Sequence, residues 1–125
     1  MRLIPLLGLA CATGLALLPN TASAQQVRQF DGRWSILVMT ENGNCEKAYR
    51  YSVQIENGQA RYAGTEGFEV QGNVRANGQV TGSIAYGQDR ADVTGRLEGD
   101  RGTGTWTASS TSRNCGGRWQ AEKRD

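Results

Sequence analysis

The side chains that could do chemistry in this chain are carboxylates, because the sequence contains no histidine. Ser-His-Asp and Cys-His arrangements are therefore excluded, and the commonest general base is absent. Two acidic pairs could act as in glycoside hydrolysis, Glu66 with Glu69 and Asp89 with Asp92. The pattern places both pairs at turns or on outward strand positions, where charges keep a surface soluble. We therefore expect no catalytic residues and no enzymatic activity.

Ligands for a metal or a cofactor are equally scarce. Cys45 and Cys115 cannot supply the four nitrogen or sulfur ligands of a structural zinc site, so we expect no metal. Haem would have to be held by tyrosine or methionine, and the candidates are Tyr49, Tyr51, Tyr62, Tyr86 and Met39. Tyrosines at alternating strand positions are more typical of core packing with the hydroxyl at the rim, so we expect no cofactor.

The N-terminus has the features of a secretory signal peptide. A positive residue precedes the apolar stretch Leu3–Leu18, and Ala22–Ala24 supplies the small residues of a cleavage site. The stretch is shorter than the roughly 20 residues of a membrane span. A retained anchor and a lipoprotein with its lipid on Cys11 are the less favoured alternatives. We expect a signal peptide over residues 1–24, one domain over residues 25–125, and a periplasmic or secreted location without a membrane span.

Charge and cysteine content restrict the class of partner. The chain has 14 basic and 12 acidic residues, with no run of either sign, and so lacks the clustered basic face of a nucleic-acid-binding protein. After signal cleavage, Cys45 and Cys115 remain in a chain bound for an oxidising compartment, where we expect them to form a disulfide. This bond would close a loop of about 70 residues and stabilise the fold by roughly 4 kcal/mol. We expect a monomer.

The residues after the signal peptide predict strands and tight turns throughout. They contain no proline, and apolar residues alternate with polar ones at the period of two that is typical of strands. Asn57-Gly58 has the composition of a type I′ hairpin turn, and Asn77-Gly78 predicts a second hairpin. The expected strands are 34–39, 49–55, 60–63, 68–74, 79–86, 90–97, 102–109 and 118–123.

Short strands in hairpin order predict an antiparallel meander. Closure of a meander into an up-and-down barrel removes its exposed edges. We therefore expect an all-β, eight-stranded antiparallel up-and-down barrel, with a β-sandwich as the alternative. The disulfide would join the loop after the first strand to the loop before the last strand, and these two strands are neighbours in a closed barrel.

Glycines recur in the middle of four successive expected strands. Gly72, Gly82, Gly95 and Gly104 all fall on the predicted inner face. Glycine inside a strand weakens it and so needs a reason. One reason is the sharp curvature of a small barrel, and another is space. Either aromatic rings fill the gaps, which we favour, or a ligand cavity remains.

A ligand in such a cavity would lie near the barrel mouth. The aromatic residues expected there are Tyr51, Tyr62, Phe68 and Trp106. They would contact a small apolar molecule, and a protein partner could instead bind at the rim.

The outer face of the first expected strand is a second candidate surface. Leu37 and Met39 would point outward from residues 34–39 and form an exposed apolar pair that a partner could contact. The alternative, which we favour, is that Gln25–Phe30 folds across this pair and covers it.

Short motifs over nearly the whole segment after the signal resemble a group of small exported bacterial proteins whose function is not established. They include Phe-Asp-Gly-x-Trp at Phe30–Trp34, Ile-Glu-Asn-Gly at Ile55–Gly58, Gly-x-Gly-Thr-Trp at Gly102–Trp106 and Cys-Gly-Gly-x-Trp at Cys115–Trp119. Some members of the group are labelled as exoproteins for haem utilisation or adhesion. This chain has no histidine to ligate haem and is far shorter than a large exoprotein, so the label implies little about its ligand.

At the level of fold, Gly32-x-Trp34 at the start of a meander is similar to lipocalins, avidins and the periplasmic inhibitors of bacterial metalloproteases. The inhibitors match in size, export and a single disulfide. Their cysteines lie closer in sequence than Cys45 and Cys115, and their inhibitory N-terminal arm is longer than residues 25–30. The resemblance implies a lipocalin-like barrel and is a weak guide to function.

Together these features predict a non-catalytic exported binding protein whose ligand is a small apolar molecule or a protein partner. One alternative is a periplasmic protease inhibitor that acts through its N-terminal arm. The other is a structural or stress-related envelope protein with no specific ligand.

Overall fold

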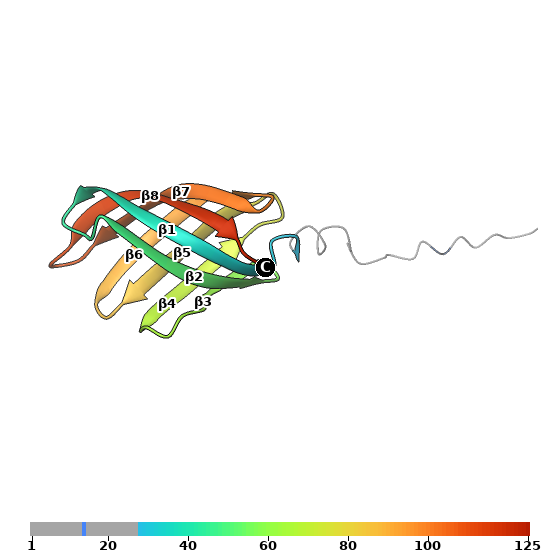
Figure 1. Cartoon of the computed structure of the whole chain (residues 1–125), viewed down its shortest axis with the longest axis horizontal. Coiled ribbons are helices and arrows are strands. Elements are labelled where there is room, and N and C mark those ends of the chain that lie inside the picture. The colour runs from blue at the N-terminus through green and yellow to red at the C-terminus, as the bar shows by residue number, and fades with distance from the viewer. Residues whose placement is uncertain (1–13, 15–27) are drawn as a thin grey trace, which may run out of the picture.

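The computed structural model describes Gly14 and residues 28–125, and its strands form a closed antiparallel barrel (Figure 1). Each strand pairs with its neighbours in sequence, and β8 pairs back onto β1. The strands are β1 (Gly32–Gly43), β2 (Ala48–Glu56), β3 (Gln59–Tyr62), β4 (Phe68–Val74), β5 (Gln79–Tyr86), β6 (Asp89–Glu98), β7 (Arg101–Ser109) and β8 (Asn114–Lys123). The eight-stranded up-and-down barrel is confirmed, and the sandwich alternative is wrong.

The predicted signal peptide over residues 1–24 lies outside the described residues except for Gly14, as do residues 25–27 of the predicted domain. Within the described part of the chain, no helix is both long enough and apolar enough to cross a membrane.

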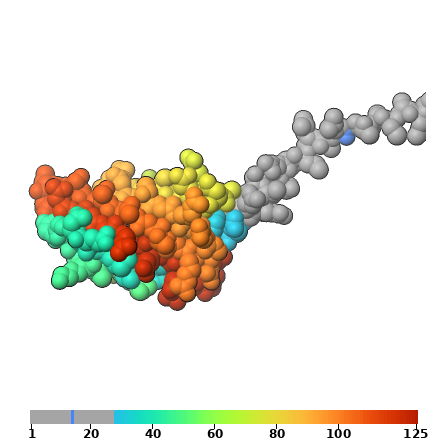
Figure 2. Space-filling view, turned by 90° about the horizontal axis from the view of Figure 1, so that it is seen from above, coloured from blue at the N-terminus to red at the C-terminus, as the bar shows by residue number. Residues whose placement is uncertain are grey.

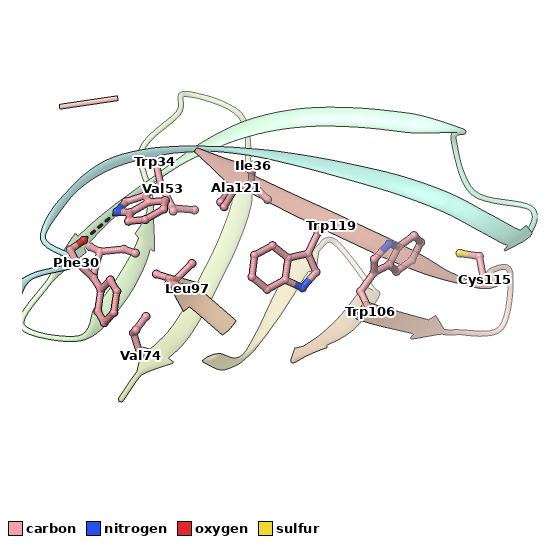
Figure 3. Packing of buried hydrophobic residues seen from close by; sticks show 11 residues of the cluster. Phe30, Trp34, Ile36, Val53, Val74, Leu97, Trp106, Cys115, Trp119 and Ala121 are labelled. Carbon is pink, nitrogen blue, oxygen red and sulfur yellow. Dashed lines mark hydrogen bonds between the residues drawn. The ribbon is translucent and has the colours of Figure 1, made fainter. Parts of the chain in front are cut away.

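The alternation of residue type along each strand separates the interior from the surface. In β8, Cys115, Trp119 and Ala121 are buried, while Arg118 and Gln120 on either side of Trp119 are exposed. Because successive side chains of a strand point to opposite faces, one register places all three inside the barrel. Figure 3 shows the buried cluster running along the barrel, from Phe30 at one end to Cys115 at the other.

The end of the barrel near Phe30 is closed by the turn that precedes β1. Phe30 is only 3% exposed, and its main-chain oxygen accepts a hydrogen bond from Trp34 Nε1 at 2.8 Å. Asp31 Oδ1 accepts a hydrogen bond from the main-chain nitrogen of Asn57 at 2.8 Å. Asn57 and Gly58 have φ values of 50° and 76°, as a type I′ turn requires. The C-terminus lies at this closed end too (Figure 1).

The seam between β1 and β8 is longer than the sequence predicts. In Figure 2, β1 in cyan lies against β8 in red, as closure of the barrel requires. A shift of register between Thr40 and Asn42 absorbs one extra residue, and pairing then continues to Gly43 opposite Cys115. The expectation that Cys115 lies in a loop is therefore wrong, because β8 begins at Asn114 rather than at Arg118.

The disulfide between Cys45 and Cys115 is present, with the two Cα atoms 5.9 Å apart and a sequence separation of 70. It ties the loop after β1 to the start of β8, at the end of the barrel opposite Phe30. A disulfide is consistent with a periplasmic or extracellular location.

Candidate functional site

A cavity of about 380 Å³ lies inside the barrel and reaches the end opposite Phe30. Small-molecule pockets have volumes of about 300–1,000 Å³, so the cavity is large enough for a small ligand. Its inner part is apolar, with Trp34, Ile36, Val53, Val74, Val93, Leu97, Trp106 and Trp119 in the lining. Its outer part reaches the loops that follow β1 and β7 and the first residue of β6.

Two of the four inward glycines receive an aromatic ring. A Cβ atom at Gly95 would lie 2.4 Å from Cζ2 of Trp119, and one at Gly104 would lie 2.5 Å from Cε2 of the same ring. The ring is held there because Trp119 Nε1 donates a hydrogen bond to the main-chain oxygen of Thr94 at 3.0 Å. At these two positions, the expectation that rings fill the glycine gaps is confirmed.

The other two glycines have no ring over them. Gly72 and Gly82 are direct partners, and a Cβ atom at Gly82 would lie 2.5 Å from the main-chain oxygen of Gln71. A Cβ atom at Gly72 would lie 3.0 Å from the Cβ of Ala60, and its next nearest atom would be the main-chain oxygen of Thr81 at 3.9 Å. Gly72 lines the cavity together with Gln71 and Ser83, so bare main chain forms part of the wall.

Three of the four predicted ligand residues, Tyr51, Phe68 and Trp106, line this cavity. The fourth, Tyr62, is not in the lining. Its ring packs 6.5 Å from the ring of Tyr51 and 5.4 Å from that of Phe68, and the residue also borders a polar groove on the outside of the barrel. Tyr62 therefore belongs to the wall rather than to the cavity surface.

Phe68 is the centre of an aromatic cluster beside the mouth. Its ring centroid lies 5.4 Å from that of Tyr49 and 4.7 Å from that of Tyr86, in addition to its contacts with Tyr51 and Tyr62. Burial raises the pKa of the Tyr51 hydroxyl, because the phenolate would lose its hydration. Tyr51 therefore presents a neutral ring to the cavity at physiological pH.

Tyr49 and Glu66 connect β2 to the loop between β3 and β4. The hydroxyl of Tyr49 donates a hydrogen bond to Oε2 of Glu66. This hydrogen bond, reinforced by the negative charge of Glu66, raises the pKa of Tyr49 to about 12. Of the predicted acidic pair, Glu66 is thus engaged with a tyrosine, while Glu69 is an exposed residue of β4.

The mouth is polar, unlike the inner cavity. Glu46, Asp89 and Arg113 reach the cavity from the loops and from the first residue of β6, and Nε of Arg113 lies 3.3 Å from Oδ2 of Asp89. Asp92 instead pairs with Arg90 on the outer face, at 3.5 Å, so the two members of the second acidic pair do not face each other. The sequence pattern singles out Asp89 only as half of an acidic pair, and it carries no signal that Asp89 meets Glu46 and Arg113 at the mouth, because the three residues come from separate hairpins.

Leu37 and Met39, the predicted partner surface, are half-buried on the outer face of β1. Leu37 lies between Arg50 and Gln120 on the neighbouring strands, and Met39 lies between Ala48 and Arg118. The stems of these long side chains can cover apolar surface.

Residues 25–30 are the segment predicted to cover this apolar pair. The part of the segment that the structure describes, residues 28–30, lies at the closed end of the barrel instead. Arg28 Nε donates a hydrogen bond to Asn57 Oδ1 at 3.3 Å, and Gln29 Nε2 donates one to the main-chain oxygen of Ala76 at 3.4 Å. Both bonds hold residues 28–30 at the closed end rather than along β1. Residues 25–27 lie outside the described residues.

Within the described residues, no group of three or more histidine, cysteine, aspartate and glutamate side chains is placed to hold a metal ion. Comparison with protein-family models, with curated proteins and with solved structures finds no match for the chain. The resemblance to small exported bacterial proteins stays a prediction.

Proposed function

We propose that the protein is a non-catalytic exported binding protein that holds a small, mainly apolar molecule inside the barrel. The observation that carries this proposal is the unfilled cavity of about 380 Å³, which is lined by the three tryptophans of the chain. A barrel with a structural role alone gains stability by filling such a space, because an unfilled cavity leaves its lining without packing partners.

The tryptophans favour an apolar ligand because their polar atoms are already engaged. Nε1 of Trp34, Trp106 and Trp119 donates to the main-chain oxygens of Phe30, Met39 and Thr94, at 2.8, 3.1 and 3.0 Å. A bound molecule therefore meets the ring surfaces and gains mainly from the removal of apolar area from water.

The polar mouth favours one orientation of the ligand. An apolar body would lie against the tryptophans, and a polar end would lie beside Glu46, Asp89 and Arg113, where water and charged partners are available. Concave apolar sites with a few polar groups at one end fix orientation in this way.

The protein acts in the periplasm or outside the cell, as a monomer and without nucleic acid, and the disulfide supports this location. The inhibitor alternative finds less support, because Phe30 is buried and Asp31 is bonded to Asn57 at the closed end. An inhibitory arm would have to displace Phe30 from the core before either residue could enter a protease.

Native and denaturing mass spectrometry of protein purified from the periplasm tests the proposal. We expect an additional mass in the native spectrum that disappears on denaturation and whose composition is mainly hydrocarbon. A bare native mass, together with no uptake of the apolar dye N-phenyl-1-naphthylamine, would contradict the proposal.

A further inference from the structure

We propose that an uncharged apolar ligand enters and leaves this cavity through the barrel wall between β3 and β4, where the ring of Tyr62 closes a break in the sheet. This inference rests on the proposed function. It assigns a route to the site, and it restricts the ligand to molecules without a charge on the part that passes the aromatic rings.

The first observation is that the β3–β4 seam is short. The two strands pair only at Gln59 with Asn73 and at Ala60 with Gly72. Beyond Ala60, β3 continues to pair with β2 as far as Tyr62, and β4 pairs with β5 from Phe68 onward. Both strands therefore remain part of the barrel wall. Toward the mouth, however, β3 and β4 are no longer paired with each other.

The second observation is the direction of the main chain at this break. The main-chain nitrogen of Val74 donates to the oxygen of Gly58 at 2.7 Å, so Val74 directs its polar groups toward the β3 side. Alternate residues of a strand direct these groups to the same neighbour, so Val70 and Phe68 also face β3. The register gives neither residue a partner there, so no ladder of hydrogen bonds closes the wall at this height.

Side chains close the break instead. The ring of Tyr62 packs against those of Tyr51 and Phe68, which line the cavity, at centroid distances of 6.5 and 5.4 Å. The same residue borders the outer groove with Gln54 and Arg61. Tyr62 therefore separates the cavity from solvent at this point, and a rotation of one side chain, with no loss of strand pairing, would join them.

The ring of Tyr62 packs directly on the loop after β3, so the ring and the loop form one unit at the break. A Cβ atom at Gly64 would lie 2.1 Å from the hydroxyl oxygen of Tyr62, so the ring lies over a residue without a side chain. The loop is held to β2 by the bond from Tyr49 to Glu66 and by the main-chain bond from Ala63 to Ser52, at 2.9 Å. Movement of the loop together with the ring would break these two bonds and would leave the pairing of β3 with β2 intact.

The mouth, in contrast, is fastened across its rim. The disulfide ties Cys45 to Cys115, and Nδ2 of Asn44 donates to the main-chain oxygen of Ser112 at 2.9 Å. The ion pair of Arg113 with Asp89 joins the β7–β8 loop to β6. An apolar molecule that entered here would pass charged groups that lose hydration, whereas the β3–β4 break offers uncharged rings.

Stopped-flow fluorescence with N-phenyl-1-naphthylamine tests the route, because this uncharged dye brightens in apolar surroundings. We expect Tyr62→Ala to raise both the association and the dissociation rate by about tenfold and to leave Kd nearly unchanged, since Tyr62 gates the site without lining it. Tyr62→Phe keeps the ring and should retain the wild-type rates. Leu37→Ala removes a half-buried side chain from the fully paired wall of β1 and should do so as well.

Wild-type rates in Tyr62→Ala would overturn the route and assign access to the mouth. No saturable dye signal in the wild-type protein would instead overturn the proposed function. If Tyr62→Ala does not fold, amide hydrogen exchange in the wild-type protein tests whether the wall is open between β3 and β4. We expect the amide of Val70 to exchange faster than that of Val93, which is paired on both sides with Gly82 and Trp106. Equal protection of the two amides would overturn the break in the wall.

Discussion

Nε1 of Trp106 donates a hydrogen bond to the main-chain oxygen of Met39 at 3.1 Å, across the intervening strand β8. The residue between them on β8 is Gly117, and a Cβ atom there would lie 1.9 Å from the same oxygen. Because Gly117 has no side chain, the ring of Trp106 on β7 can reach over β8 and form a hydrogen bond with β1.

Gly117→Ala should lower the free energy of unfolding by about 2–3 kcal/mol, because β1 and β8 must separate to admit the methyl group. Urea denaturation measures the change. Gly67→Ala is the matched control, since the nearest atom to a Cβ atom there is Tyr86 Cε2 at 3.8 Å, and it should be nearly neutral. An equal decrease in the free energy of unfolding of both variants would show that close contact with β1 is not the reason for glycine at position 117.

Gly104 and Gly72, two of the inward glycines, should respond differently to substitution. A Cβ atom at Gly104 would lie 2.0 Å from the main-chain oxygen of Thr94 and 2.5 Å from the Trp119 ring, so Gly104→Ala should cost about 1–3 kcal/mol. Gly72→Ala meets only Ala60 closely and should cost less while it weakens binding of N-phenyl-1-naphthylamine. Urea denaturation and dye titration of both variants separate these effects, and the reverse order would contradict the assignment of the cavity wall.

Ionisation of Tyr49 should weaken the fold at high pH. Its pKa is raised from 10.0 to about 12 by the hydrogen bond to Glu66, so its contribution to stability is complete below pH 10 and is lost as pH rises toward 12. Absorbance of tyrosinate should show that Tyr49→Phe removes a step near pH 12 from the titration of the folded protein. Loss of a step near pH 10 instead would mean that the hydroxyl does not bind Glu66 in solution.

Reduction of the disulfide should lower the free energy of unfolding by about 4 kcal/mol, because a loop of about 70 residues is released in the unfolded chain. Urea denaturation with and without a phosphine reductant measures the difference. Cys45→Ser with Cys115→Ser should reproduce the reduced protein. A change below about 1 kcal/mol would contradict the role of the bond as the main constraint on the unfolded state.

The period-two pattern predicts the barrel and the inward faces because burial on one side of a strand dictates residue type directly. The limits of β1 and β8 could not be predicted, since Asn114, Gly116 and Gly117 are small or polar and form strand only through their partners. They pair with β7, and the pairing of Gly116 and Cys115 with β1 follows a register shift between Thr40 and Asn42. Pairs of glycines such as Gly116 and Gly117 suggest a loop when they are considered without their partner strands.

The candidate site was only partly predictable for a related reason. The sequence places Tyr51 and Phe68 on inner faces, but it does not show that β3 ends at Tyr62 and leaves β4. Nor does it show that Trp119 reaches over Gly95 and Gly104, which leaves Gly72 uncovered. Both outcomes depend on contacts between strands rather than on the pattern within one strand.

The most direct test of a ligand-binding cavity is a titration with N-phenyl-1-naphthylamine of the wild-type protein and two alanine-to-phenylalanine variants on adjacent strands. Ala91 of β6 lines the cavity. Ala85 lies on the outer face of β5, where it pairs with Arg90, the residue next to Ala91. We predict saturable one-to-one binding that Ala91→Phe abolishes and Ala85→Phe preserves. Absence of saturable binding, or equal binding by both variants, would contradict a ligand site inside the barrel.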